Sequence, residues 1–328
     1  MAGAMSLRLI RPGGREVVDI THLYQVITWA GTVKQTCREL TVGLAVPKDG
    51  SITPPPLEEG AVLVLSQGSE ALFTGPLVDA TTTTQSAVVD LYGLDNGRFL
   101  TGNKGWYQFS STTPEAAART MCQDFEIPVE QLATAGVGIT RKFSGVALDR
   151  IIKTMYNLAG NQNGKQYLIR FTGDGRLAVV ERPTTASLTI RETMGVTNTW
   201  SISNLQNSVA IYTSEGQLVR RIQDKESIQR NGRLEHVIIQ RDGEDASAEA
   251  KAWLEEYGLQ QKLTVETLGD TRLRTGDGVL LRDTGSGVSG LFWIDADTHT
   301  WKNGQYYTKL TLNFRRLADD TEVGTEVS

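Results

Sequence analysis

The chain has 328 residues, of which 39% are hydrophobic and 22% charged, and its formal net charge is -5. This length is enough for more than one domain, each with a core large enough to fold without disulfide bonds. The acidic balance argues against a general affinity for nucleic acid, because binding phosphate backbones needs clustered Lys and Arg. No run approaches the ~20 apolar residues of a membrane span. The N-terminus also lacks the regions of a secretory signal peptide.

The two cysteines, Cys37 and Cys122, lie far apart and match no metal-binding spacing. We interpret them as reduced thiols of a protein made in a cytosol. Residues 1–5 have the look of a cloning remnant and take no part in the fold prediction.

The first hundred residues alternate short apolar runs with turn residues, which is typical of an all-β domain. The predicted strands lie at residues 7–10, 26–29, 40–46, 60–65, 71–75 and 87–92. The prolines at 54–56 fall between strands, as expected for a residue that cannot donate to a sheet. We predict a β-barrel domain over residues 1–104.

Residues 105–195 differ because helical periodicity appears. Thr113-Pro114-Glu115 supplies an N-cap, a proline at the first helical position and an acid in the first turn. A second predicted helix starts near Ser144 and ends at Gly160, with one apolar face. Gly173-Asp-Gly175 is a hairpin turn between two strand-like runs. We predict a small α+β domain.

The β pattern resumes over residues 196–318 and is clearest from Gly276 to Phe314, where apolar and polar residues alternate with period two. Lys302-Asn-Gly304 supplies turn residues that tolerate positive φ. One helix, predicted at residues 245–258, interrupts the pattern. We predict a second β-barrel domain with this helix as an insertion. Residues 319–328 are acidic and polar without periodicity, which predicts a disordered tail.

The two β-blocks resemble each other in the order of their segments. The matching segments are 26–29 with 197–200, 38–42 with 207–211, and 60–65 with 276–281. We interpret this as a duplication, and the matching places of Trp29 and Trp200 favour core or inter-domain packing for both. The predicted fold class is therefore mainly β, with two similar antiparallel β-barrel domains flanking a small α+β domain.

Asp295, Asp297 and His299 stand at i, i+2 and i+4, so a regular strand would place all three on one face. Carboxylate and imidazole could share Zn²⁺ or Mn²⁺ there. The simpler interpretation is the polar, solvent-facing side of the β-meander, because a metal needs further ligands and supporting hydrogen bonds that the sequence does not reveal. We assign no metal-binding, cofactor-binding or catalytic residue.

The other candidate residues favour structural interpretations. His22 and His236 stand alone in β-patterned segments, and Cys122 falls on the apolar stripe of its helix, where a thiol is usually inert. The glycines of Gly285–Gly290 precede a strand and not a helix, so they predict a β-turn and not a phosphate loop. No motif of a nucleophilic enzyme is present. We therefore expect a protein that is not an enzyme.

Several segments, in order along nearly the whole chain, carry a resemblance to one family. They are Ile27–Gly31, Tyr107–Glu115, Cys122–Pro128, Glu181-Arg182, Asn207–Tyr212, Gly290–Trp301 and Leu310–Phe314. As an ordered set they resemble the XkdQ/YqbQ family of phage tail proteins, the hub proteins of contractile tails. Members are often labelled hydrolases, but nothing in this sequence justifies that label.

The resemblance implies a virion structural protein similar to the central hub of T-even phages and to late control protein D. It implies a homotrimer with two similar barrels per chain, so that six barrels match a hexameric tail tube and the trimer matches a trimeric spike. The implied partners are the tail tube protein, the spike protein and other baseplate proteins, without a cofactor. The implied location is the tail baseplate of a virion or phage-like particle, after synthesis in the host cytoplasm. If the hub surrounds a lumen, DNA can pass through it.

Two alternatives stay open at this point. One is an enzyme, a tail-associated cell-wall hydrolase with Asp295, Asp297 or His299 in its site. The other is a carbohydrate-binding module, for which Trp106-Tyr107 is the best candidate for an exposed aromatic pair.

Overall fold

The computed structural model describes residues 3–14, 16–240, 245–283, 285–314 and 321–326. The fold is mainly β with a few helices, which confirms the predicted class. The chain divides into two compact units, one made of Met1–Val196 with Val265–Ser328 and the other of Thr197–Thr264. Within the described ranges, none of the helices combines the length and the apolarity needed to span a membrane.

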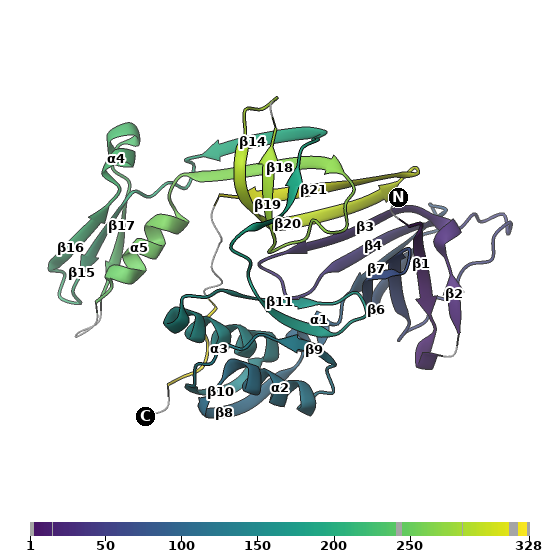
Figure 1. Cartoon of the computed structure of the whole chain (residues 1–328), viewed down its shortest axis with the longest axis horizontal. Coiled ribbons are helices and arrows are strands. Elements are labelled where there is room, and N and C mark those ends of the chain that lie inside the picture. The colour runs from purple at the N-terminus through teal and green to yellow at the C-terminus, as the bar shows by residue number, and fades with distance from the viewer. Residues whose placement is uncertain (1–2, 15, 241–244, 284, 315–320, 327–328) are drawn as a thin grey trace. The chain divides into compact units, whose positions relative to one another are not determined.

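The N-terminal strands form what we call module 1 (Figure 1). They are β1 (Met5–Ile10), β2 (Val17–Asp19), β3 (Tyr24–Thr32), β4 (Glu39–Ala45), β5 (Val62–Gln67), β6 (Glu70–Thr82) and β7 (Val88–Leu94). Short 3-10 turns lie at Pro12–Gly14 and Thr21–Leu23. The inward residues of the alternating strands, such as Leu7 and Trp29, are fully buried and form one core.

An α+β segment follows. Its elements are α1 (Gly97–Gly102), β8 (Lys104–Thr112), α2 (Pro114–Asp124), β9 (Val129–Leu132), β10 (Ile139–Ala147), α3 (Leu148–Asn163), β11 (Tyr167–Phe171) and β12 (Leu177–Glu181). Helix α2 begins at the predicted Pro114. Helix α3 begins later than predicted, because Ser144 still pairs with Trp106 in the sheet of β8 and β10. It also continues past Gly160 to Asn163, and the next residue, Gly164, caps it in the left-handed conformation with a φ of 73°.

The predicted disordered tail is wrong for residues 321–326, which pack on the α+β segment. The backbones of Thr325 and Lys142 exchange two hydrogen bonds of 2.9 Å. The Nε atom of the buried Arg141 donates to the Val323 carbonyl over 2.7 Å, and Val323 packs against the core. A polar segment without periodicity is ordered here because a neighbouring strand edge supplies its hydrogen bonds. Residues 319–320 and 327–328 lie outside the described ranges.

The remaining strands of the larger sheet form module 2. They are β13 (Ala186–Ile190), β14 (Gly195–Ser201), β18 (Gln260–Leu268), β19 (Gly278–Arg282), β20 (Ser289–Lys302) and β21 (Gln305–Asn313). Strand β13 was assigned to the α+β domain by the sequence, but it pairs with β19. The predicted turn between β20 and β21 is present, with positive φ at Asn303 (53°) and Gly304 (71°).

The unit at Thr197–Thr264 has a sheet and a core of its own. It holds β15 (Ser208–Tyr212), β16 (Leu218–Gln223), α4 (Lys225–Asn231), β17 (Glu235–Ile239) and α5 (Ser247–Glu256), together with most of β14 and the first half of β18. The sequence assigned the strands at 207–212 and 234–239 to the second barrel, which is wrong, because they pair with each other in parallel. Helix α5, close to its predicted place, covers this small sheet through Ala246 and Ala250. The insertion in module 2 is therefore a folded unit and not a single helix.

The two modules repeat one strand order. Module 1 has the order β3-β4-β7-β6-β5, and module 2 has β14-β18-β21-β20-β19. This repeat supports the duplication inferred from the sequence but changes two matches. Strand β14 is the counterpart of β3, but the residue at the position of Trp29 is Thr197 and not Trp200. The counterpart of β4 is β18 and not the segment at 207–211, which is part of the inserted unit. Pairing of β3 with β20 then joins both modules in one 13-stranded sheet (Figure 1).

The hairpin of β11 and β12 contacts module 1 at close range. Thr74 Oγ1 donates to the Gly173 carbonyl over 2.7 Å, and Asn96 Nδ2 donates to the Gly175 carbonyl over 2.8 Å. A Cβ atom on Gly173 would lie 1.7 Å from the Ala71 carbonyl oxygen, which is backbone and cannot rotate away. The glycine pair that predicted a hairpin turn therefore also allows the α+β segment to pack on module 1.

We predict that Gly173→Ala destabilises the chain, because the added methyl group must push two backbones apart. The expected loss in the free energy of unfolding is about 1–3 kcal/mol, the usual cost of overpacking. Denaturant unfolding followed by circular dichroism measures it. The matched control is Gly102→Ala, since a Cβ at Gly102 meets no atom within 4 Å. Equal stability of the two variants would contradict the close packing.

Candidate functional site

The candidate site is the seam between the modules, by which we mean strand β3, the second half of β20, and the loop at 270–277. Residues Val26–Thr32 of β3 pair antiparallel with Ala296–Lys302 of β20. The loop is tied to the same place, because Thr275 Oγ1 donates to the Gly31 carbonyl over 3.0 Å. The seam is therefore the place where the two halves of the duplication meet.

A β-bulge in β20 decides which side chains face the seam. The register of β20 against β21 shifts between Ile294 and Ala296, so Asp295 is the extra residue. Before the bulge Phe292 and Ile294 are buried, and after it Asp297 and His299 are buried. The prediction that Asp295, Asp297 and His299 share a solvent-facing side is therefore wrong, because the bulge exchanges the two faces of the strand.

Asp297 is fully buried and accepts hydrogen bonds from two segments. Arg38 Nη1 donates to Asp297 Oδ1 over 3.0 Å, and Arg38 Nη2 donates to Oδ2. The backbone N–H of Thr275 donates to Oδ1 over 2.6 Å. Arg38 precedes β4 in module 1, so this two-pronged ion pair holds β20 and the loop of module 2 against module 1.

His299 completes the buried polar cluster, and its neighbours fix its tautomer. Its Nε2 atom lies 3.1 Å from the Leu273 carbonyl and 3.1 Å from Asp297 Oδ2, both acceptors. Its Nδ1 atom lies 2.8 Å from the Tyr306 hydroxyl and 3.1 Å from the Thr308 hydroxyl, both able to donate. The neutral ring with the proton on Nε2 fits these neighbours, because its one N–H faces two acceptors and its one lone pair on Nδ1 faces two hydroxyl donors.

Burial and charge set the pKa values of this pair. Burial alone would raise the pKa of Asp297, but the charge of Arg38 and hydrogen bonds from His299 and Arg38 outweigh it, so that pKa is lowered. Burial lowers the pKa of His299 below its ordinary 6.5, although Asp297 acts in the opposite direction. The seam therefore holds a carboxylate, a guanidinium and a neutral imidazole at neutral pH.

Trp29 packs over this cluster. The guanidinium carbon of Arg38 lies 4.1 Å from the centre of the Trp29 ring, and the His299 ring centre lies 4.8 Å from it. Trp29 is therefore a core residue as predicted, whereas Trp200 is 67% exposed and is not. A Cβ on Gly31 would lie 2.4 Å from Arg38 Nη1, so a larger residue there would have to displace the guanidinium from its place beside Asp297.

The metal hypothesis gains no support from this geometry. Asp295 Oδ2 accepts from Asn313 Nδ2 over 3.0 Å, away from Asp297 and His299, and burial raises the pKa of Asp295. Both carboxylate oxygens of Asp297 and both ring nitrogens of His299 already have hydrogen-bond partners within the protein. In the described residues, no group of three or more His, Cys, Asp and Glu is placed to hold a metal ion.

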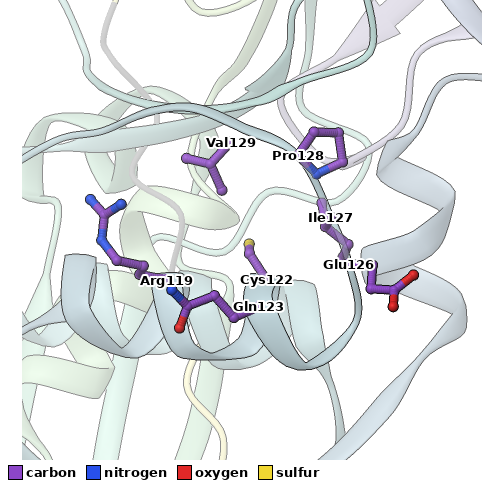
Figure 2. A pocket seen from close by; sticks show the side chains of 7 residues that line it. All are labelled: Arg119, Cys122, Gln123, Glu126, Ile127, Pro128 and Val129. Carbon is purple, nitrogen blue, oxygen red and sulfur yellow. The ribbon is translucent and has the colours of Figure 1, made fainter.

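A surface hollow at the end of α2 contains the thiol of Cys122, which makes it a candidate site for a nucleophilic cysteine (Figure 2). It is lined by Arg119, Cys122, Gln123, Glu126, Ile127, Pro128 and Val129. In Figure 2 the sulfur of Cys122 points toward Val129, and the Glu126 carboxylate points away from it. Burial raises the pKa of Cys122 to about 11, so the thiol stays protonated, and no histidine lines the hollow. Burial likewise raises the pKa of Cys37 to about 11.

The other predicted candidates lie apart from the seam. His236 stacks on Trp253 with ring centres 3.7 Å apart, and His22 lies in a 3-10 turn. Most of the predicted turn at Gly285–Gly290 lies between β19 and β20, and its last two residues begin β20. Trp106 is 74% exposed, as the sequence predicted, while the Tyr107 hydroxyl donates to Asp124 Oδ2 over 2.8 Å.

Sequence reasoning missed Arg38, Thr275 and Tyr306 as partners of the Asp297–His299 pair. Arg38 and Asp297 are 259 positions apart, so no local pattern connects them. The one available signal was the duplication, which shows that there are two modules but not which of their strands meet.

Comparison with known proteins identifies the family. The model of the YQBQ-like family matches residues 27–313, and the chain belongs to this family. A relative in Bacillus subtilis (strain 168), the uncharacterized protein YqbQ, is 22% identical over 313 residues, which cover 88% of this chain and 93% of the relative.

Solved structures with the same fold are tail and secretion-system proteins. The 43 kDa tail protein of prophage MuSo2 from Shewanella oneidensis has a TM-score of 0.72 at 11% identity, covering 94% of this chain and 97% of that one. A type VI secretion system component from E. coli has a TM-score of 0.52 at 8% identity, covering 93% and 76%. That component is described as structurally similar to the T4 bacteriophage tail proteins gp27 and gp5.

We predict that Asp297→Asn strongly destabilises the chain, because it leaves the Arg38 guanidinium, whose side chain is only 15% exposed, without its counter-charge. Removing one partner of a buried ion pair typically costs about 3–5 kcal/mol, measured here as the free energy of unfolding in denaturant. Glu130→Gln is the control, since it breaks the 2.7 Å Arg176–Glu130 pair, whose side chains are both 47% exposed, and such pairs contribute little. Similar losses in the two variants would contradict a structural role for the seam.

The lowered pKa of His299 predicts a pH dependence. Below its ordinary value of 6.5 the unfolded chain takes up a proton that the folded chain does not, so this residue makes stability fall as pH drops from about 6.5. His299→Gln removes that contribution, and its stability should change less than that of the wild type between pH 7 and pH 5. Unfolding midpoints across this range measure the difference. Parallel pH profiles would show that His299 is not buried as a neutral ring.

Proposed function

We propose that this member of the YQBQ-like family is a structural hub protein of a contractile phage tail or phage-like particle. In this role a trimer joins a hexameric tail tube on one side to a trimeric spike on the other. The observation that carries the proposal is the repeat of one strand order in modules 1 and 2. Three chains with two modules each present six similar units, so a single trimer can match partners of sixfold and threefold symmetry.

The tail and secretion-system proteins that share the fold support this role. The tail tube protein, the spike protein and neighbouring baseplate proteins are the proposed partners, and the tail baseplate is the proposed location. A hub of this kind acts by binding, so its functional surfaces are strand edges and loops and not a catalytic cleft.

The net negative charge of the chain is compatible with a trimer whose lumen lets DNA pass without binding it. The net charge of -5 disfavours strong attachment to phosphate, because such attachment needs clustered cations. Passage of DNA through a lumen of the trimer is part of the proposal, and specific nucleic-acid binding is not.

The buried cluster at Asp297 favours a structural role over the cell-wall hydrolase alternative. A general acid or base must reach its substrate, but Asp297 and His299 are 1% and 0% exposed and contact other parts of the same chain. Their geometry fits the joining of two modules.

The test is co-assembly of the chain with the tube and spike proteins of the same phage or particle. We predict trimers in the assembled complex, visible by electron microscopy as a ring of six similar modules between tube and spike. Because some interfaces form only when all partners are present, the measurement is made on the mixture and not on the isolated chain. A chain that stays monomeric in that mixture, or that releases products from cell-wall substrate, would overturn the proposal.

A further inference from the structure

The seam inside the chain shows how one module joins another. Strand β3 of module 1 lies at the end of the repeated order β3-β4-β7-β6-β5, and it pairs with the second half of β20 in module 2. The first half of β20 pairs with β19 instead, up to Trp293. One edge of β20 therefore pairs with two strands in succession. Its first half pairs with β19 of its own module, and its second half pairs with β3 of the other module.

Module 1 contains an equivalent of β20 that has no such neighbour. Strand β6 pairs with β5 up to Pro76 and has a register shift against β7 between Leu77 and Asp79. This matches the shift of β20 between Ile294 and Ala296. After the shift, residues Asp79–Thr82 pair with β7 on one side, and no described residue pairs with them on the other. All of Asp79–Thr82 are exposed.

Module 2 contains an equivalent of β3 that is equally free. Strand β14 stands last in the strand order, with β18 as its single partner among the described strands. Residues Thr197–Trp200 are exposed, whereas Ile27 and Trp29 of β3 are fully buried. A seam needs one strand like β3 and one strand like β20. Among the described strands, β3 and β20 pair with each other, whereas their equivalents β14 and β6 each keep a free edge.

The composition of both free edges permits pairing. Neither Val78–Thr82 nor Gly195–Ser201 contains Lys or Pro, the residues that usually protect an exposed edge. Asp79 is the only charged residue in these two stretches. Their threonines favour extended backbone.

We propose that β14 of one chain pairs antiparallel with the second half of β6 in a second copy, repeating between chains the seam that β3 and β20 form within the chain. The contact is head to tail, because each copy offers β14 on one side and β6 on the other. Head-to-tail contacts generate closed rings when the rotation between copies allows it. This inference rests on the proposed function for the size of the ring, which is three copies and six modules.

The hydrogen bonds of module 2 give the register of this contact. The Gly269 N–H donates to the Tyr306 carbonyl over 2.9 Å, and the Met194 N–H donates to the Glu266 carbonyl over 2.7 Å. When these two registers are continued along the strands, Leu310, Val265 and Gly195 lie in one row. The equivalent row of module 1 ends at Ile27. Four residues further along, Thr199 therefore has the position that Gly31 holds in β3. The registers of β20 on β21 and of β6 on β7 place Ala80 at the position of Asp297. Since Asp297 pairs with Gly31, Ala80 should pair with Thr199 of the next copy.

Cysteine cross-linking tests the contact on the concentrated full chain. All variants carry Cys37→Ser, because Cys37 is the partly exposed native thiol and Cys122 is buried. Ala80→Cys with Thr199→Cys is treated with a bifunctional thiol reagent that spans the ~5 Å between directly opposed Cβ atoms. The expected product on denaturing gels is a covalent trimer with peptides of residues 80 and 199 linked. Each single variant alone should stay monomeric, and a mixture of the two single variants should give dimers.

A register control uses Ala80→Cys with Thr197→Cys, which moves one thiol by two residues along β14 and should reduce the cross-linked yield several-fold. Monomers from the first double variant, or equal yields from both double variants, would overturn the proposed pairing. Covalent trimers that fail to bind tube or spike would support the pairing and count against the hub function. Trimers in an assembled complex that show no link between residues 80 and 199 would support the hub function and contradict the pairing.

Discussion

The ion pair between Arg38 and Asp297 is the interaction on which the arrangement of the two modules depends. Both groups lie in the seam, where a buried charge without a partner is costly. A slip of β20 by one residue would turn Asp297 to the opposite face of the strand and leave the Arg38 guanidinium without its carboxylate. We infer that the pair contributes mainly to the correct register, because the cost of desolvating two charges offsets much of their attraction. Thr275, His299 and Trp29 lie against the pair.

Local features of this fold were predictable from sequence because their causes are local. Pro114 marks the start of α2, and Asn303-Gly304 forms the turn between β20 and β21. The bulge at Asp295 has no local signature, since the alternation of residue types continues through it unchanged. Burial of Asp297 and His299 follows from the bulge and from Arg38, a residue far away in the sequence. The candidate residues could therefore be named from sequence, but their role could not.

Pairing partners were the other limit of the sequence. The periodicity of β15 and β17 identified them as strands, but a period of two does not say which strands pair. Both were assigned to the second barrel, although β15 pairs in parallel with β17 in a separate unit. The C-terminal residues 321–326 were missed for a related reason. Their order comes from Lys142 and Arg141, which bind their backbone, and not from any apolar pattern of their own.

The exposed edge strands of the large sheet differ in length and in charge. At one end β2 has only three residues, and Arg11 and Glu16 form an ion pair beside it over 3.0 Å. A short edge flanked by charges is a usual way to discourage pairing with another chain. Strand β14 has seven residues without a charge, and β6 continues past its bulge without Lys or Pro. An exposed edge that lacks such protection carries a risk of aggregation, so its persistence is best explained by a partner that covers it. Because β3 and β20 already form such a contact within the chain, the geometry of that partner is available from the duplication itself.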